Sequence, residues 1–484
     1  MKLERWEAWT LAAILIVAAG ARIAGLDAAL WYDEVFTLTH YVRAPLGQVL
    51  TDFSSLNNHM FYSLQAKASV ALLGESAWAM RLPAMLFGIG SLVLLWAMAR
   101  APAGRVATLF AVFLMAISYH HVWFSQNARG YTGILFWTSL ATLLLIEGLK
   151  HPDWRIWTAY GASVAAGMYT HLSAGFFFAS HALVYGVAWL ARGAHGLAPY
   201  AGLRDIRPVC GFALGGVLTL LLHVPLIGQV LAAMSKVSEG KATSAMAEWV
   251  NPLRALKEIA GSLSAFGPLA PVALAGTLLV LVWGAVALWR RAPLLVAVYA
   301  VSIPLALGLL VLLDFRIWPR YFFVDIGFVL LCLAFGAQEL CGWMAGLLRM
   351  PKLGKPLFGA GVLVASVASL VLLARNYEHP KQDFDGAMQL IAEQREPRDV
   401  ATSMGLASEP IHSYFAPEWP VVRNEGDLAR LARDAKRVWL VTAFDDHVRP
   451  EQATALAQVQ RSFVLVRELD GTLGGGAVKV YRSR

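Results

Sequence analysis

The sequence predicts a polytopic α-helical membrane protein with a small α/β domain at its C-terminal end. Of its 484 residues, 58% are hydrophobic and 15% are charged, and the mean hydropathy is +0.56. Apolar stretches long enough to cross a bilayer recur from the first residues to about residue 375. Beyond that point the chain changes to amphipathic and alternating segments, which are typical of a water-exposed domain.

The apolar stretches predict about eleven transmembrane helices. They are Trp9–Leu26, Arg81–Arg100, Val106–His121, Tyr131–Leu149, Ile156–Thr170, Ala174–Leu190, Val209–Ala232, Ile259–Leu288, Pro293–Leu313, Tyr321–Leu347 and Leu357–Arg375. Met60–Leu73 is too short to span, so we expect an interfacial helix there. The first stretch follows Lys2 and Arg5 but has no convincing small-residue cleavage site, which favours a retained helix over a signal peptide.

Basic residues in the short loops predict the orientation. A cytoplasmic N-terminus places five basic loops on the cytoplasmic side, as the positive-inside rule expects: Arg100/Arg105, Lys150/Arg155, Arg192/Arg204/Arg207, Arg290/Arg291 and Arg349/Lys352/Lys355. Loop 27–80 and the region after residue 375 are then external. The net charge of +8 is therefore explained by topology and by contact with anionic membrane lipids, and we expect no nucleic-acid partner.

We expect residues 1–375 to form the transmembrane domain and residues 376–484 a separate α/β domain. Helices are predicted over Phe384–Gln394, Asp427–Lys436 and Pro450–Gln460, and strands over Val438–Phe444, Phe463–Leu469 and Ala477–Tyr481. Gly474-Gly475-Gly476 lacks the strand-then-helix setting of a nucleotide loop and predicts a hairpin turn. The three cysteines indicate neither a disulfide framework nor a zinc site.

The first external loop carries adjacent carboxylates, Asp33 and Glu34. Acidic groups at a membrane rim are costly to leave unpaired, so we interpret the pair as catalytic. One carboxylate would remove a proton from an acceptor hydroxyl, and its neighbour would orient the base or hold a cation. The alternative is that both are solvated or pair with Arg22 or Arg43.

Asn58 and His59 follow in the same loop. A neutral imidazole suits a second-shell orienting role, a weak base or a metal ligand, and the alternative is a hydrogen-bonded interfacial side chain. A divalent metal held by Asp33, Glu34 and His59 therefore remains an open interpretation. His120, His121 and His171 have no carboxylate at a useful spacing, which favours structural roles for them.

Two further external motifs carry arginine. Ser125-Gln126-Asn127-Ala128-Arg129-Gly130-Tyr131 offers a guanidinium suited to phosphate and a neutral hydroxyl donor, although both could instead anchor the interface. In the motif from Asp314 to Tyr321, Arg316 and Arg320 run against the positive-inside trend, which favours phosphate binding. Trp318 and Tyr321 are more typical of interface residues than of a sugar platform.

The order of these motifs resembles the protein O-mannosyltransferase and aminoarabinose-transferase relatives within the C-type glycosyltransferases, a group similar to glycosyltransferase family 39. The resemblance rests on Trp-Tyr-Asp-Glu, Asn-Asn-His, Arg81-Leu82-Pro83 at the start of a span, Ser-Gln-Asn-Ala-Arg-Gly-Tyr, and Arg320-Tyr321 before a late span. It covers nearly all of the membrane part. One departure is His59-Met60-Phe61, where bacterial relatives often have His-Pro-Pro, and this change affects the side expected to face the acceptor.

The resemblance implies a sugar transferred from a polyprenyl-phosphate donor to a lipid, glycan or protein acceptor at the external face of a bacterial inner membrane. It implies Asp33 as the base, with Glu34 at the second acidic position. Arg129, Tyr131, Arg320 and Tyr321 then match motifs near the donor phosphate. Independently, a phosphate leaving group needs cationic stabilisation more than protonation, so one base plus arginines suffices for an inverting displacement.

Two other functions share some of these features. A lipid-linked glycan polymerase or ligase uses the same donor chemistry. A flippase or other transporter would also be polytopic, but we would expect its ionisable or helix-breaking features at mid-membrane in paired halves. The polar groups here gather at one face.

Overall fold

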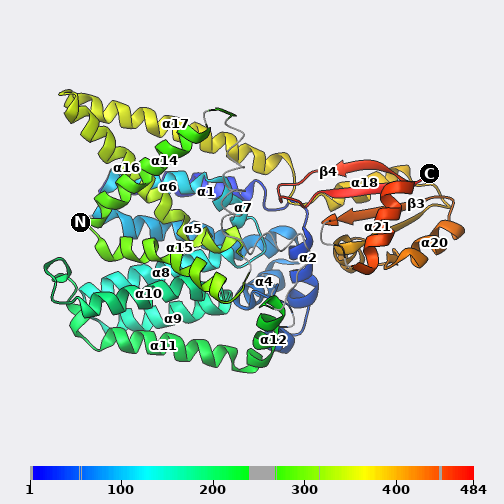
Figure 1. The fold of residues 1–484 in the computed structure, drawn as a ribbon, viewed down its shortest axis with the longest axis horizontal. Coiled ribbons are helices and arrows are strands. Elements are labelled where there is room, and N and C mark those ends of the chain that lie inside the picture. Colours follow the sequence, from blue (N-terminus) through cyan, green and yellow to red (C-terminus); the bar gives the residue numbers. More distant parts are fainter. Residues whose placement is uncertain are drawn as a thin grey trace.

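The computed structural model describes residues 4–53, 55, 57–238, 267–268, 270–315, 317–445, 448 and 450–484. A long helical bundle occupies one part of the molecule, and a compact α/β domain lies beyond one end of it (Figure 1). The short helices α2 (Tyr32–Thr37) and α4 (Met60–Leu73) lie at that end, between the bundle and the domain. The predicted fold class is therefore confirmed.

The bundle contains thirteen α-helices within the described ranges. They are α1 (Arg5–Ile23), α5 (Ala77–Ala103), α6 (Arg105–Ala116), α7 (Tyr119–Ser125), α8 (Tyr131–Lys150), α9 (Trp154–Thr170), α10 (Ala174–Leu190), α11 (Arg207–His223), α12 (Ile227–Ser238), α14 (Ala270–Trp289), α15 (Pro293–Leu312), α16 (Ile326–Leu347) and α17 (Gly354–Glu378). Among described residues, eight helical stretches are long and apolar enough to cross a membrane, or nine if the bent pair α6–α7 is one span. This agrees roughly with the expected count.

Two predicted spans differ from the structure. The stretch Val106–His121 forms two helices, α6 and α7, which meet at an angle of 58° around Ile117 and Ser118. The bend allows α7 to carry its C-terminal end to the motif that begins at Ser125. The predicted span Ile259–Leu288 corresponds to α14 only from Ala270 onward, because residues 259–266 and 269 lie outside the described residues.

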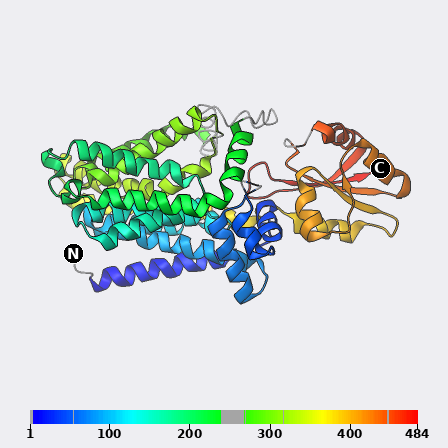
Figure 2. The same ribbon diagram turned by 90° about the horizontal axis from the view of Figure 1, so that it is seen from below.

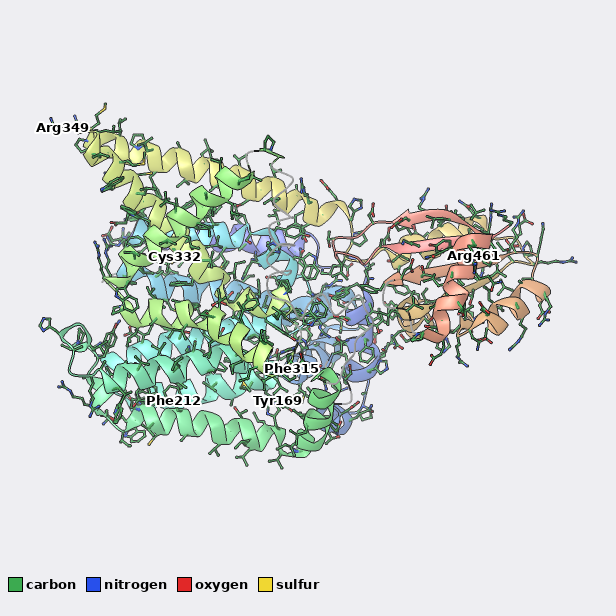
Figure 3. The ribbon with its side chains drawn as sticks, viewed as in Figure 1. Tyr169, Phe212, Phe315, Cys332, Arg349 and Arg461 are labelled. Atoms are coloured by element: carbon green, nitrogen blue, oxygen red, sulfur yellow. The ribbon has the colours of Figure 1, made fainter. Side chains whose placement is uncertain are left out.

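The two ends of the bundle differ in character. Arg349, in one of the basic loops, lies at the end far from the α/β domain, whereas Phe315 and Tyr169 lie toward the domain (Figure 3). Phe315 belongs to the arginine-containing segment between α15 and the 3₁₀ helix η7 (Pro319–Asp325). This arrangement separates the Arg349 loop from the predicted site by the length of the bundle.

The C-terminal domain is built on a five-stranded sheet in the order β2-β1-β3-β5-β4. Its strands are β1 (Val400–Met404), β2 (Val421–Val422), β3 (Val438–Ala443), β4 (Phe463–Leu469) and β5 (Val478–Ser483), and its longer helices are α18 (Phe384–Gln394), α20 (Glu425–Asp434) and α21 (Pro450–Ser462). Strands β1, β2 and β3 are parallel, and β4 and β5 form an antiparallel pair. The sequence predicted β3, β4 and β5 and the turn at Gly474–Gly476.

Strands β1 and β2 were missed because neither has a clear strand pattern. β1 reads Val-Ala-Thr-Ser-Met, with Thr402 and Ser403 fully buried, and β2 contains two residues. A short strand with buried hydroxyls does not alternate between polar and apolar residues, so its periodicity gives no signal. Figure 2 shows the same domain from another direction, again beyond the end of the bundle that carries α2.

Candidate active site

Five segments that are distant in the sequence meet at the domain-facing end of the bundle. They are α2, the residues before α4, the turn between α7 and α8, the residue after α9, and η7. The polar groups that they bring together include Asp33, His59, Arg129, His171 and Arg320. The gathering of these side chains is a property of the tertiary fold, since more than 280 residues separate the first from the last.

Asp33 and Arg129 form the centre of this cluster. The Asp33 Oδ2 atom lies 3.9 Å from Arg129 Nη2, and the Asp33 side chain is 18% exposed, while that of Arg129 is 4% exposed. Arg129 Nη1 donates to the carbonyl of Asn57 at 2.8 Å, which fixes the guanidinium. A partly exposed carboxylate thus lies beside a buried, permanently charged group, which is an arrangement chemically suited to proton transfer next to a bound anion.

His59 presents a second donor toward Arg129. Its Nδ1 accepts the backbone N–H of Gly130 at 2.8 Å, so in the neutral ring the hydrogen resides on Nε2. That Nε2 lies 2.9 Å from Arg129 Nη2, which also carries hydrogens. At 2.9 Å the two nitrogens have no atom between them, so an acceptor oxygen that satisfies both would lie beside the pair. A Cβ at Gly130 would lie 2.9 Å from His59 Nδ1 and 2.7 Å from Thr170 Cγ2, so glycine permits the close approach.

Glu34 is the most enclosed acidic group of the site. Its carboxylate is fully buried and accepts hydrogen bonds from Arg81 Nε at 2.8 Å and Nη2 at 2.5 Å, and from the backbone N–H of Ala128 at 2.6 Å. Burial alone would raise the pKa of Glu34, but the charge and hydrogen bonds of Arg81, with a further contribution from Lys381, hold the pKa below its usual value. These contacts fit the orienting role considered for Glu34 in the sequence analysis.

The Glu34–Arg81 pair connects three parts of the site. Arg81 also donates to the carbonyls of Leu26, Ala28 and Ala29, which lead into the α2 loop. Through Ala128, the same carboxylate reaches the turn that presents Arg129. Arg22 and Arg43, the partners considered from the sequence, lie elsewhere: Arg22 contacts His121 and Ser125, and Arg43 pairs with Glu75. Glu34 therefore holds Asp33 and Arg129 next to each other.

The late motif contributes Arg320 and Tyr321. The Arg320 guanidinium carbon lies 6.0 Å from the centre of the Tyr131 ring and 4.5 Å from that of Trp318, and its charge interacts with that of Asp33. The Tyr321 ring lies 6.4 Å from His171 and is thus at the edge of the cluster. Arg316, the other predicted phosphate-binding residue of this loop, lies outside the described residues.

The predicted metal ligands do not converge on a common point. Both oxygens of Glu34 are held by Arg81 and Ala128, and His59 Nδ1 is occupied by Gly130 N–H. Among the described residues, no group of three or more His, Cys, Asp and Glu side chains is placed to hold a metal ion. Asn58 is buried and bonds to Asp52 and Ser63, so it holds its own loop.

Two residues of the cluster were not assigned to the site in the sequence analysis. His171 was interpreted as structural, but its ring centre lies 4.4 Å from that of His59 and 6.1 Å from that of Tyr131. Arg81 was noted only as part of a motif at the start of a span. A buried glutamate requires a cationic partner, but the sequence alone does not reveal which arginine supplies it.

Acidification below about pH 6.5 is expected to destabilise the protein through His59. Burial and the charges of Arg129, His171 and Arg320 lower the pKa of His59 well below 6.5. The unfolded chain therefore binds a proton that the folded chain excludes, and stability is lost as the pH falls through 6.5. Between pH 7.5 and 5.5 this residue should account for about 1.4 kcal/mol of the loss.

Unfolding of the wild type and of His59→Gln at several pH values in detergent would measure this contribution. The pH slope should be smaller for His59→Gln and unchanged for His412→Gln, because His412 is exposed. Equal slopes in all three proteins would show that His59 does not contribute.

Comparison with known proteins supports the identity suggested by this geometry. Residues 60–196 match the model of the dolichyl-phosphate-mannose-protein mannosyltransferase family. That segment includes His59's neighbouring helix and the whole Arg129 motif. No curated protein matches the chain in sequence.

Solved structures share the fold over almost the whole chain. ArnT from Cupriavidus metallidurans in the apo state has a TM-score of 0.53 and 16% identity, with 98% of this chain and 97% of ArnT covered. ArnT from the same organism bound to undecaprenyl phosphate has a TM-score of 0.51 and 14% identity, with 98% of this chain and 98% of ArnT covered. The archaeal oligosaccharyltransferase AglB from Archaeoglobus fulgidus, in complex with an inhibitory peptide and a dolichol-phosphate, gives 0.52 and 13%, with 91% of this chain and 70% of AglB covered. The chain therefore shares its fold with ArnT and AglB, and its residues 60–196 resemble the dolichyl-phosphate-mannose-protein mannosyltransferase family.

Proposed function

We propose that this protein transfers a sugar from a polyprenyl-phosphate donor to an acceptor hydroxyl by a single inverting displacement. The observation that carries this proposal is the distance of 3.9 Å between the Asp33 carboxylate and the Arg129 guanidinium. Transfer needs a base beside the acceptor hydroxyl and a cation beside the leaving phosphate, and these two side chains lie together at one end of the bundle.

The phosphate of the sugar donor would lie where the hydrogen-bond donors of Arg129 and His59 converge. Arg129 Nη2 and His59 Nε2–H face each other at 2.9 Å, and an anionic phosphate oxygen would accept from both. Arg320 supplies a second guanidinium nearby, and its contact with Tyr131 places it on the same side. Arginine is suited to this role because its planar donors match phosphate oxygens and it stays charged.

The reaction balances with these groups alone. Asp33 accepts the proton of the acceptor hydroxyl while the acceptor oxygen forms a bond to the anomeric carbon. The bond between that carbon and the phosphate oxygen breaks, and the lipid phosphate leaves with the electron pair. Arg129 and Arg320 stabilise the charge that develops on the phosphate. Attack opposite to the leaving group inverts the configuration, and no second carboxylate is needed because water is not activated in a separate step.

The solved relatives support a lipid phosphate as the carrier. ArnT has been captured with undecaprenyl phosphate and AglB with a dolichol-phosphate. By analogy with these names, the carrier here is a polyprenyl phosphate whose chain lies against the helices, and the acceptor is a lipid, a glycan or a protein. The positive-inside pattern supports a site and a C-terminal domain outside the cytoplasm of a bacterial inner membrane.

Reconstitution would test this function directly. The purified protein in liposomes would receive undecaprenyl phosphate carrying a radiolabelled sugar, together with an extract of envelope lipids and glycans as acceptors. Appearance of labelled acceptor together with free undecaprenyl phosphate is the expected result. Labelled donor that crosses the bilayer without cleavage would instead indicate a flippase, and growth of a lipid-linked glycan chain would indicate a polymerase or ligase.

Replacement of Arg129 by glutamine should weaken the binding of undecaprenyl phosphate by about ten- to a hundredfold, which corresponds to the loss of a charge-assisted hydrogen bond of about 1.5–3 kcal/mol. Fluorescence-quenching titration in nanodiscs would measure the affinity. The control is Arg192→Gln, because Arg192 is exposed and stacks on Trp189 away from the cluster. Unchanged affinity in a folded Arg129→Gln protein would contradict the phosphate assignment.

A further inference from the structure

The segment that joins the bundle to the C-terminal domain reaches into the framework of the active site. We call residues 376–382 the junction segment; it runs from the end of α17 toward α18. Asn376 Nδ2 donates to Gln126 Oε1 at 2.7 Å, and Lys381 Nζ donates to the carbonyl of Gln126 at 2.5 Å. Gln382 Oε1 accepts the backbone N–H of Tyr32 at 3.1 Å.

These contacts reach both the segment that carries the proposed base and the turn that carries the proposed phosphate-binding arginine. Tyr32 directly precedes Asp33, and Gln126 opens the turn that ends at Arg129. The junction segment therefore holds one backbone point beside the base and another beside the phosphate-binding arginine. Within the Glu34–Arg81 framework it is an additional tie between the same two motifs.

Lys381 is buried to an extent that a linker lysine rarely is. It is 7% exposed, and its ammonium lies 5.3 Å from the centre of the Trp123 ring, in addition to its bond to Gln126. Burial and the positive charge of Arg81 together lower the pKa of Lys381 to about 7, and the negative charge of Glu34 acts in the opposite direction. Such burial costs several kcal/mol, so the contacts of this side chain must offset it.

Gln382 connects the domain to the catalytic helix through a single amide. Its side chain is fully buried, with Nε2 donating to the carbonyl of Gly476 at 3.0 Å while Oε1 accepts from Tyr32. Gly476 belongs to the connection between β4 and β5. One side chain thus spans the C-terminal sheet and the start of α2.

The β4–β5 connection supports the junction segment along its length. Thr472 N–H donates to the carbonyl of Pro380 at 2.9 Å, and Leu473 N–H donates to that of Lys381 at 3.2 Å. Thr472 Oγ1 also accepts from Trp123 Nε1 at 3.0 Å. A Cβ at Gly471 would lie 2.3 Å from the Lys381 carbonyl oxygen, so the two backbones pack without space for a side chain.

We propose that Lys381 and Gln382 are positioning residues through which the C-terminal domain holds Asp33 and Arg129 in register. The proposal rests on the transferase reaction proposed above. It assigns the C-terminal domain a part in turnover, in contrast to a passive cover. Displacement of a catalytic group by about 1 Å can reduce a rate by about a hundredfold, so even a small loosening of this tie should be visible in kcat.

The first test removes the hydrogen bonds of Gln382 without changing its length. Gln382→Met should lower kcat about ten- to a hundredfold, because Asp33 loses its placement. The KM for the undecaprenyl-phosphate sugar should change by less than about threefold, since Arg129 keeps its hydrogen bond to the Asn57 carbonyl. The matched control is Gln452→Met, because the Gln452 side chain donates to the Val422 carbonyl within the C-terminal domain.

The second test acts from the domain side and leaves every side chain of the proposed site intact. Gly471→Ala forces the β4–β5 connection away from Lys381 and should lower kcat in the same way. Gly474→Ala is the matched control, because a Cβ at Gly474 meets nothing within 4 Å. Parallel losses in Gln382→Met and Gly471→Ala, with both controls at wild-type activity, would support the proposal.

Hydrogen–deuterium exchange of the full chain in nanodiscs gives a readout that does not depend on activity. In both test variants, peptides covering residues 31–36 should exchange at least about tenfold faster than in the wild type and the controls, because Gln382→Met removes the acceptor of the Tyr32 amide and Gly471→Ala displaces the backbone that carries it. Unchanged exchange and unchanged kcat in either test variant would overturn the positioning role. Wild-type protein that moves no sugar, but shows the exchange effect, would instead refute the proposed function.

Discussion

Replacement of Asp33 by asparagine is expected to reduce sugar transfer about a hundred- to ten-thousandfold, the range associated with loss of a general base. The amide has nearly the same shape but cannot accept the acceptor's proton. The carboxylate is partly exposed and lies 3.9 Å from Arg129, so the change removes the base without opening a cavity. Single-turnover transfer from a labelled undecaprenyl-phosphate sugar would measure the rate.

The affinity for the lipid phosphate distinguishes loss of the base in Asp33→Asn from damage to the structure of the site. Asp33→Asn should bind undecaprenyl phosphate at least as tightly as the wild type, because one negative charge beside the phosphate site is removed. Asp27→Asn is a suitable control, since Asp27 is exposed and lies at the start of the same loop. A folded Asp33→Asn protein with full transfer activity would refute the assignment of the base.

Loss of one partner from the Glu34–Arg81 pair should destabilise the protein by about 3–5 kcal/mol, because the remaining charge is left buried without compensation. Both side chains are fully buried, and Arg81 also satisfies three backbone carbonyls. Glu34→Gln and Arg81→Met are therefore expected to unfold at much lower denaturant concentrations. Unfolding in mixed micelles with increasing sodium dodecyl sulfate would measure the change.

A surface pair provides the comparison for this prediction. Arg43 and Glu75 are bonded at 2.7 Å, but their side chains are 44% and 40% exposed, so Arg43→Gln should cost at most about 1 kcal/mol. The double variant Glu34→Gln/Arg81→Met should be more stable than the sum of the single losses predicts, because neither charge is left alone. Additive losses would mean that Glu34 and Arg81 do not act as a pair.

The sequence was sufficient for the helical parts that follow simple periodicity. Met60–Leu73 was predicted with the bounds of α4, and Phe384–Gln394 with those of α18, because both are continuous and end at clear signals. The bend between α6 and α7 was not predictable, since the apolar run continues through it. Hydropathy reports residence in an apolar environment and carries no information about the direction of the helix axis.

The candidate site also contains some residues that the sequence could identify and some contacts that it could not. Asp33, His59, Arg129 and Arg320 could be chosen from the sequence because charged groups at membrane rims are expensive and arginine suits phosphate. The partner of Glu34 could not, because Arg22, Arg43 and Arg81 are equivalent on the basis of charge alone. Only the packing of α5 against the α2 loop selects Arg81.

The sequence by itself determined that this chain is a polytopic helical membrane protein with a C-terminal α/β domain, because hydrophobicity and its period are local properties. Tertiary structure alone decided that Glu34 is enclosed by Arg81, that His59 lies against Arg129, and that Lys381 and Gln382 reach Gln126 and Tyr32. The physical reason is that these contacts join segments separated by up to 350 residues, and hydrogen-bond geometry at such separations depends on how the helices pack.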